Sequence, residues 1–364
     1  GAGVTVAVID TGIDGSHPDL IGAVVGGMDA SGVGSPDGQT PVGDDSSHGT
    51  LVASVLAGRG SGPSGTDGVI GVAPEANLLS VSVGFGGAGT RSSDDQIAEA
   101  VRWAVDNGAD VINMSLTRNT LEWPESWDDA FLYAMTNDVV VVAAAGNRGT
   151  GTTVVGAPAT MPGVVTVAGV DQQRRASEGA SSQGITISVA APAERLVGAG
   201  PGGQYFEWEG SSGAAPIVSG LVALIRSAYP ELDAANVINR LIATATPVGT
   251  PVPSPLYGYG LIDARAAVTA SVGQVTANPM GDLREWIRVN RRADVAPGAE
   301  PIPAPAPTTQ PAPQAPDTQA SENPNPLGAV LPTVSSLRDV GIPLAVYVMF
   351  VSLIVAGITM WRRQ

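Results

Sequence analysis

Residues 4–10 read VTVAVID, and this run ends on Asp10 before a Thr11-Gly12 turn. The run is short, almost entirely apolar and rich in β-branched valine, which is typical of a strand buried on both faces of a parallel sheet. Comparable apolar runs follow at residues 78–83, 111–116, 139–144, 164–170 and 185–190. The first run therefore predicts a buried strand that carries a carboxylate at its C-terminal end.

Helical patterns lie between or after these runs. Ser93 with Gln96 three residues later predicts a capping box, and Asn107-Gly108 ends the helix that it would start. Residues 126–137 and 233–244 also have helical periodicity. Alternating strands and helices predict right-handed crossovers and a three-layer α/β domain with a mainly parallel sheet. In such a sheet, ligands bind at the C-terminal ends of the strands.

Three motifs are expected at that edge of the sheet. Asp10 ends the first strand, His48 opens a helix in SHGTLVASVLAG, and Ser212 opens another in GSSGAAPIVSGLVALIRSAY, with Pro216 in its first turn. Asp, His and Ser in this chain order are a known arrangement of a catalytic triad. The imidazole takes the proton of the serine hydroxyl, and the carboxylate orients the imidazole. Asp44 and Asp45 are rival candidates for that carboxylate.

An oxyanion formed by serine attack needs donors that are already in place. The backbone N–H of Ser212 at its helix start is one candidate. The side chain of Asn147, which ends the run VVVVAAAGN, is the other.

These residues carry a family resemblance. The motifs VIDTGID, HGT, AAAGN, GSSGAAPIVSG and GYGLIDARAA resemble the subtilases, the subtilisin-like serine proteases, over about residues 1–270. The resemblance implies a cofactor-free protease with Asp10, His48 and Ser212 as its triad and Asn147 as its oxyanion donor. It also implies that His17 is a structural turn residue, and it leaves a calcium site open.

The resemblance extends to substrate binding. It implies an edge segment at Ser82, Val83 and Gly84 that pairs with the substrate backbone, and a P1 pocket lined by Ser115, Leu116 and Thr117. Two positions depart from the family pattern beside the serine, where Ser211 replaces the usual Thr and Gly213 replaces a larger residue.

Composition excludes several other kinds of chemistry. The chain has 364 residues, 18 basic residues that are all Arg, 34 acidic residues, two His and no Cys. Thiolate chemistry, Cys-based metal sites and lysine Schiff bases are therefore ruled out, and a multi-histidine metal centre is not expected. The formal net charge of −16 argues against a nucleic-acid partner, because duplex binding depends on basic residues.

The C-terminal part predicts a membrane anchor. Residues 342–361 contain twenty uncharged, mostly apolar residues, enough to cross a ~30 Å hydrocarbon core, and Arg362 and Arg363 follow at once. The positive-inside rule places the C-terminus in the cytoplasm and the preceding chain outside. Because the chain begins at Gly1, we expect any signal peptide or propeptide to precede it.

The expected organisation has five parts. They are a peptidase domain (1–272), a short basic segment (273–296) with a solvated helix, a Pro-rich linker (297–340), a transmembrane helix (341–361) and a cytoplasmic tail (362–364). This arrangement resembles the mycosins, the membrane-anchored proteases of actinobacterial type VII secretion, and implies the secretion machinery as a partner.

Two other functions are considered. One is a pseudo-protease that acts as a scaffold in a secretion complex. An intact triad argues against lost activity, but it is compatible with a scaffold role held in addition. The other is an α/β-hydrolase lipase or esterase, which needs a G-x-S-x-G elbow and the order Ser, Asp, His; neither is present at Ser212.

Overall fold

The computed structural model describes residues 1–62 and 64–291. A seven-stranded sheet lies at the centre, with every pairing parallel and the order β2-β5-β1-β6-β7-β8-β9. Its strands are β1 (Thr5–Asp10), β2 (Val24–Asp29), β5 (Asn77–Ser82), β6 (Val111–Met114), β7 (Val140–Ala144), β8 (Val165–Val170) and β9 (Ile187–Pro192). The predicted parallel α/β fold is confirmed.

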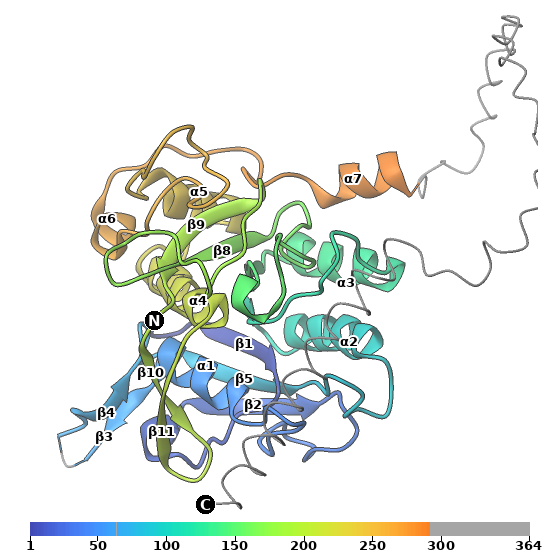
Figure 1. Ribbon diagram of the computed structural model, residues 1–364, viewed down its shortest axis with the longest axis vertical. Helices are drawn as coiled ribbons and strands as arrows, with labels where there is room; N and C mark the ends of the chain where they lie inside the picture. Colours follow the sequence, from blue (N-terminus) through green and yellow to red (C-terminus); the bar gives the residue numbers. More distant parts are fainter. Residues whose placement is uncertain (63, 292–364) are drawn as a thin grey trace, which may run out of the picture. The chain divides into compact units, whose positions relative to one another are not determined.

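Helices cover both faces of the sheet, which makes three layers (Figure 1). On one face lie α2 (Ser93–Asp106) and α3 (Glu125–Thr136). On the other lie α1 (His48–Ala57), α4 (Ser211–Ala228), α5 (Ala234–Ala243) and α6 (Ala264–Thr269). Two short 3₁₀ helices, η1 (Pro18–Leu20) and η2 (Arg148–Thr150), lie in connections.

The sequence of β1 shows why both faces are covered. Val6 and Val8 point into the core beneath α1 and α4, whereas Ala7 and Ile9 point into the core beneath α2 and α3. All four side chains are fully buried. Because side chains alternate along a strand, an unbroken apolar run is what a two-sided core requires.

Two hairpins and one strand were not expected from the sequence. The hairpins are β3 (Arg59–Ser61) with β4 (Asp67–Ile70), and β10 (Leu196–Gly200) with β11 (Gln204–Trp208). Strand β2 lies at the sheet edge, is only half-buried and contains Gly26 and Gly27, so it lacks the apolar signal of a central strand. A Cβ at Gly27 would lie 2.1 Å from the Asp37 carbonyl oxygen, so no larger residue fits there without a shift.

Two details of the helix starts differ from expectation. The side chain of Ser92, not Ser93, caps α2 by accepting the Asp95 N–H at 3.2 Å, so the predicted capping box is wrong. Helix α4 starts at Ser211, which places Pro216 in its second turn rather than its first. A proline there removes the helical hydrogen bond to the carbonyl four residues earlier, that of Ser212.

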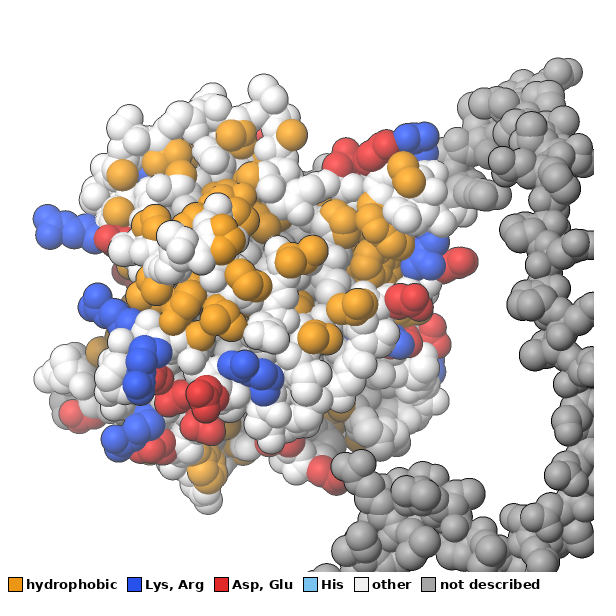
Figure 2. Space-filling model, turned by 45° about the horizontal axis from the view of Figure 1, so that its top comes forward, with side chains coloured by type: hydrophobic (Ala, Val, Ile, Leu, Met, Phe, Trp, Pro, Cys, Tyr) orange, Lys and Arg blue, Asp and Glu red, His pale blue; other side chains and the backbone are white. Residues whose placement is uncertain are grey.

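A final helix, α7 (Leu283–Asn290), packs against α3. Arg284, Glu285 and Arg288 are exposed, which agrees with the predicted solvated face, whereas Leu283 and Ile287 are buried. Figure 2 shows hydrophobic side chains gathered on the face that carries α5 and α7. Ile185, which lines an apolar groove beside α7, is 92% exposed there.

Within the described residues, α4 is the one helix long and apolar enough to cross a membrane, but 72% of it is buried and it forms part of the core. The predicted transmembrane helix, Pro-rich linker and tail lie outside the described residues.

Candidate active site

Asp10 and His48 are in direct contact at the C-terminal end of β1. The ring Nδ1 of His48 lies 2.8 Å from Oδ1 and 3.0 Å from Oδ2 of Asp10. Asp10 is 1% exposed, and the Thr11 N–H donates to its Oδ1 at 2.7 Å. Because an ionised carboxylate can only accept, Nδ1 carries the proton and Nε2 remains the basic nitrogen.

The residue after His48 explains how α1 comes so close to β1. A Cβ at Gly49 would lie 2.3 Å from the carbonyl oxygen of Gly12, so only glycine fits without a shift. The Gly49 N–H donates to Thr11 Oγ1 at 3.0 Å, which ties the first turn of α1 to the turn after β1. The HGT motif therefore fixes the position of the imidazole through the backbone.

The surroundings of His48 change its basicity. Burial lowers the pKa of His48, but the charge of Asp10, its hydrogen bond and the charge of Asp45 together raise that pKa above its ordinary value of 6.5. Asp45 and His48 line one cavity, and Asp45 acts on the ring by charge, whereas Asp10 holds the ring by a hydrogen bond. Of the three candidate carboxylates, Asp10 is therefore the one that orients the ring.

Ser212 lies in the first turn of α4 and is bonded twice to Ser115, just beyond the end of β6. The Ser212 hydroxyl donates to the Ser115 carbonyl oxygen at 3.1 Å, and the Ser115 hydroxyl donates to the Ser212 carbonyl oxygen at 2.8 Å. The second bond satisfies the carbonyl that Pro216 leaves without its helical partner. Ser115 was predicted as a pocket residue, and the structure adds this bracing contact.

Asn147 lies just beyond β7 and is held by the residue before Ser212. The Ser211 N–H donates to Asn147 Oδ1 at 2.8 Å, so the amide nitrogen Nδ2 is the donor that remains. Gly210, at φ 141°, lies close to the Asn147 amide, since a Cβ at Gly210 would lie 3.1 Å from Nδ2. Ser211 was noted in the sequence only as a departure from the family pattern, and its contact with Asn147 was missed.

A cavity of about 570 Å³ opens beside His48. Leu116 and Thr117 line it together with Phe85, Ile97 and Arg118, which sequence reasoning missed. The role of Leu116 and Thr117 in a P1 pocket stays a prediction. The Arg118 guanidinium is paired with Asp94 at the cavity wall. The apolar surface and fixed polar groups of the cavity suit a side chain of a peptide bound in an extended conformation.

Ser82, Val83 and Gly84 do not line this cavity. Ser82 and Val83 are fully buried, the Val83 N–H donates to the Asp10 carbonyl at 2.7 Å, and the Gly84 N–H donates to Gln96 Oε1 at 2.7 Å. The Val83 and Gly84 donors are thus already used inside the molecule. The prediction that this segment pairs with substrate has no support from its geometry.

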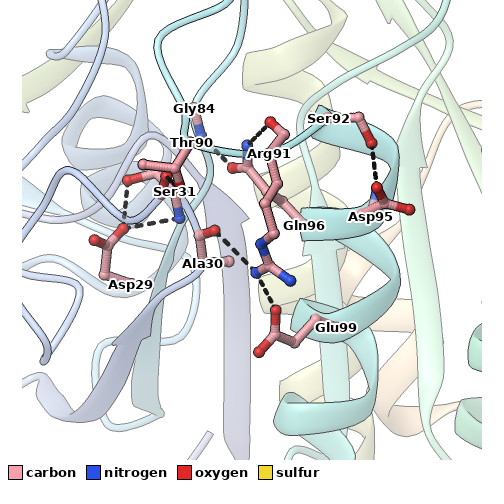
Figure 3. A network of polar contacts seen from close by, with 10 residues as sticks. All are labelled: Asp29, Ala30, Ser31, Gly84, Thr90, Arg91, Ser92, Asp95, Gln96 and Glu99. Carbon is pink, nitrogen blue, oxygen red and sulfur yellow. Dashed lines mark hydrogen bonds and ion pairs between the residues drawn. The ribbon is translucent and has the colours of Figure 1, made fainter.

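Figure 3 shows what the segment after Gly84 does instead. Gln96 is fully buried and bridges Gly84 to the carbonyl of Arg91, which its Nε2 meets at 2.8 Å. The Thr90 N–H donates to the Ser31 carbonyl at 2.8 Å. Residues 84–91 therefore form a loop fastened at both ends, and Phe85 from this loop reaches the cavity.

Trp208, at the end of β11, is a further residue that the sequence did not indicate. Its ring lies edge-on to the His48 ring, with centroids 5.9 Å apart. A Cβ at Gly213 would lie 3.4 Å from the Trp208 ring but 2.3 Å from Leu196 Cδ1, so Gly213 leaves room for Leu196. The Trp208 ring therefore lies against His48 and beside Gly213, the residue after Ser212. Only the folded hairpin brings it there.

His17 is buried and accepts the Asp19 N–H on Nδ1 at 3.1 Å, which starts η1 and agrees with a structural role.

Within residues 1–62 and 64–291, no three His, Asp or Glu side chains are grouped so that they could hold a metal ion.

A sequence profile described as the subtilase family matches residues 1–260. The chain belongs to the subtilase family. Its relatives include subtilisin DY of Bacillus licheniformis, which is 41% identical over 273 residues, covering 73% of this chain and 91% of the relative. It is therefore a subtilisin-like serine peptidase by descent, and the predicted family is confirmed.

Solved structures of subtilases agree. MycP1 from the ESX-1 type VII secretion system matches with a TM-score of 0.66 and 32% identity, over 77% of this chain and 84% of that one. Fervidolysin from Fervidobacterium pennivorans, a keratinolytic enzyme related to subtilisin, matches with a TM-score of 0.65 and 32% identity. The match covers 75% of this subtilase and 43% of fervidolysin. The expected likeness to mycosins is therefore confirmed.

Proposed function

We propose that this chain is a serine endopeptidase in which Asp10, His48 and Ser212 form the triad and Asn147 donates to the oxyanion. The observation that carries the proposal is the contact of His48 Nδ1 with both oxygens of the buried Asp10, which leaves Nε2 free to act as the base. Family membership supports the same assignment.

The reaction then follows from the groups in place. The Ser212 hydroxyl leaves the Ser115 carbonyl, gives its proton to His48 Nε2 and attacks the peptide carbonyl carbon. Asn147 Nδ2 and the Ser212 N–H stabilise the oxyanion, and His48 returns the proton to the leaving amine. His48 Nε2 then takes a proton from water as the water attacks the acyl carbon. The bond to Ser212 Oγ breaks, His48 returns the proton to Oγ, and the acid leaves.

We further propose that the enzyme is a membrane-anchored, extracytoplasmic, mycosin-like protease associated with type VII secretion. The likeness to MycP1 and the apolar residues 342–361 followed by Arg362 and Arg363 support this role. The proposed organisation keeps the peptidase domain at 1–272, the basic segment at 273–296 and the linker at 297–340. Its substrates are polypeptides.

Labelling of the full chain with a fluorophosphonate probe tests the catalytic assignment. Labelling that is lost in Ser212→Ala and slowed in Asn147→Ala is expected. A folded wild-type chain that takes up no probe would contradict the proposal and favour the scaffold function.

Fractionation of cells tests the anchor. The full chain is expected in the membrane fraction, and a chain that lacks residues 342–361 is expected in the soluble fraction. Equal distribution of the two chains would contradict the anchor.

A further inference from the structure

Helix α7 is fastened to the start of α3 by four side chains, which we call the C-terminal clamp: Trp123, Asp128, Trp286 and Arg291. Arg291 Nε donates to Asp128 Oδ2 at 2.7 Å, and Trp123 Nε1 donates to Asp128 Oδ1 at 2.6 Å. Arg291 Nη2 donates to the Trp123 carbonyl at 3.0 Å, and the two indole rings lie 4.3 Å apart. The clamp therefore joins residues more than 160 positions apart in the chain.

The clamp contains a buried charge. Asp128 is 6% exposed, and each of its oxygens has one partner, an indole N–H and a guanidinium. Arg291 supplies the opposite charge. A buried carboxylate that loses its cation carries a large desolvation cost, so Arg291 is expected to hold α3 and α7 together firmly.

The residue before Asp128 contacts two residues of the cavity wall. Trp127 is fully buried, and its Nε1 donates to the Asp94 carbonyl at 2.9 Å. The Arg118 guanidinium lies over the Trp127 ring, 5.6 Å from its centroid, and pairs with the Asp94 carboxylate. Arg118 and Asp94 both line the cavity beside His48. One turn of α3 thus contacts α7 on one side and the cavity wall on the other.

Residues 115–123 connect the surroundings of Ser212 to the clamp. Ser115 is bonded to Ser212, Arg118 lines the cavity, and Trp123 belongs to the clamp. Between them, Arg118 N donates to the Ala157 carbonyl at 2.7 Å. The Ser115 end is braced by β6 and α4, whereas the Trp123 end is braced by α7.

Helix α7 lies outside the residues 1–260 that the subtilase profile matches. Trp286 and Arg291 therefore lie outside the part of the chain that the profile describes, whereas Trp123 and Asp128 lie inside it. Arg291 is also the last of the described residues, so the chain from residue 292 onward continues directly from the clamp.

We propose that Arg291 is a positioning residue for substrate binding. Through Asp128 and the first turn of α3, it holds the cavity wall made by Arg118 and Asp94 in the form that receives the more distant residues of an extended substrate. The inference rests on the proposed function, since it assigns a substrate to the cavity. Arg291 does not touch the triad residues, so the chemical step at Ser212 does not depend on it.

The test compares extended and short substrates on the full-length chain. Arg291→Ala is assayed with peptides that place four residues before the scissile bond, with single-residue ester substrates and with the fluorophosphonate probe. We expect KM for extended peptides to rise about tenfold, with kcat, the ester rates and the labelling rate within about twofold of wild type. Arg291→Lys keeps the charge but loses the guanidinium fork, and is expected to recover part of the loss.

Arg284→Ala is the matched control, because Arg284 is an exposed arginine on the same helix, and it is expected to match wild type on every substrate. A general loss of folded protein would lower labelling and both substrate classes in parallel. Trp286→Leu keeps the Asp128–Arg291 pair and removes the ring contact, so it tests the clamp without leaving a buried charge unpaired.

The Trp286→Leu variant is expected to raise KM for extended peptides selectively, by less than Arg291→Ala. Unchanged KM for extended peptides in both variants, or a loss shared equally by short and extended substrates, would overturn the inference. A wild-type chain that takes up no probe would instead overturn the proposed function, so the two failures are distinguishable.

Discussion

The backbone N–H of Ser211 donates to the side-chain Oδ1 of Asn147 at 2.8 Å. The Ser211 hydroxyl lies 2.9 Å from the same oxygen, and it accepts the N–H of Gly146 at 3.0 Å. Ser211 is fully buried, so these bonds are made inside the protein. The residue before the proposed nucleophile therefore fixes which end of the Asn147 amide is available to an oxyanion.

Ser211→Ala keeps the backbone N–H and removes the hydroxyl, so the Asn147 amide is held by one bond fewer. It is expected to lower kcat by roughly threefold to tenfold with KM little changed, because an oxyanion donor acts in the transition state. The loss is smaller than the ~10²–10³ in kcat that removal of the oxyanion asparagine costs in subtilisin, a member of this family. Steady-state kinetics on one peptide measures both constants. Ser211→Thr keeps the hydroxyl and serves as the control; a similar loss in that variant would contradict the explanation.

Asp10→Asn is expected to lower kcat by about 10⁴-fold, since the triad carboxylate fixes the tautomer and stabilises the charged ring. It should also move the acid limb of kcat/KM to lower pH. The base must be neutral, and Asp10 raises the pKa of His48, so activity is lost as the pH falls through that raised value. A pH–rate profile of the variant measures the residual activity.

Asp45→Asn provides the comparison for this profile. Asp45 raises the pKa of His48 by its charge alone and does not bond the ring. The variant should therefore shift the acid limb in the same direction by a smaller amount, with kcat retained. An acid limb that stays in place in both variants would show that another group sets it.

Ser115→Ala is expected to destabilise the fold by about 1–3 kcal/mol, because the Ser212 carbonyl loses the hydroxyl that replaces its helical partner. In a Pro216→Ala background, residue 216 has an N–H that can donate to the Ser212 carbonyl. Ser115→Ala should therefore lower the free energy of unfolding by less in that background. Denaturant unfolding of the two single variants and the double variant measures the coupling. Additive costs would mean that Pro216 and Ser115 act independently.

Gly49→Ala is expected to destabilise the protein by about 1–3 kcal/mol and to lower kcat, because its Cβ would meet the Gly12 carbonyl and push α1 and His48 away from Asp10. Thermal unfolding and peptide kinetics measure the two effects. Gly273→Ala is the control, since a Cβ there meets nothing within 4 Å. If both variants keep the wild-type Tm and kcat, the close approach does not constrain the site.

Much of the fold was predictable because its signals are local. The run at residues 4–10 encodes a strand with two buried faces, and the structure places β1 at Thr5–Asp10 between two cores. The start of α4 was predictable from GSSG, although the turn that holds Pro216 was not. Strand β2 escaped prediction because an edge strand with two glycines lacks apolar periodicity.

The residues proposed for catalysis were equally accessible from sequence, since Asp10, His48 and Ser212 each follow or open an element whose ends share one edge of the sheet. Gln96 shows the limit of such reasoning. Its spacing from Ser93 suggested a helix cap, whereas in the fold its amide bridges Gly84 and Arg91. The same side chain satisfies either pattern, and only the path of the loop decides between them.

The sequence by itself determined the alternation of strands and helices, the order of the proposed triad and the family. These depend on hydrophobic periodicity and on short motifs within one turn or strand. Only the tertiary structure decided that Trp208 lies against His48, that Ser211 orients Asn147 and that Arg291 pairs with Asp128. Those contacts join residues 64 to 163 positions apart, and no local pattern specifies a partner that packing alone brings within reach.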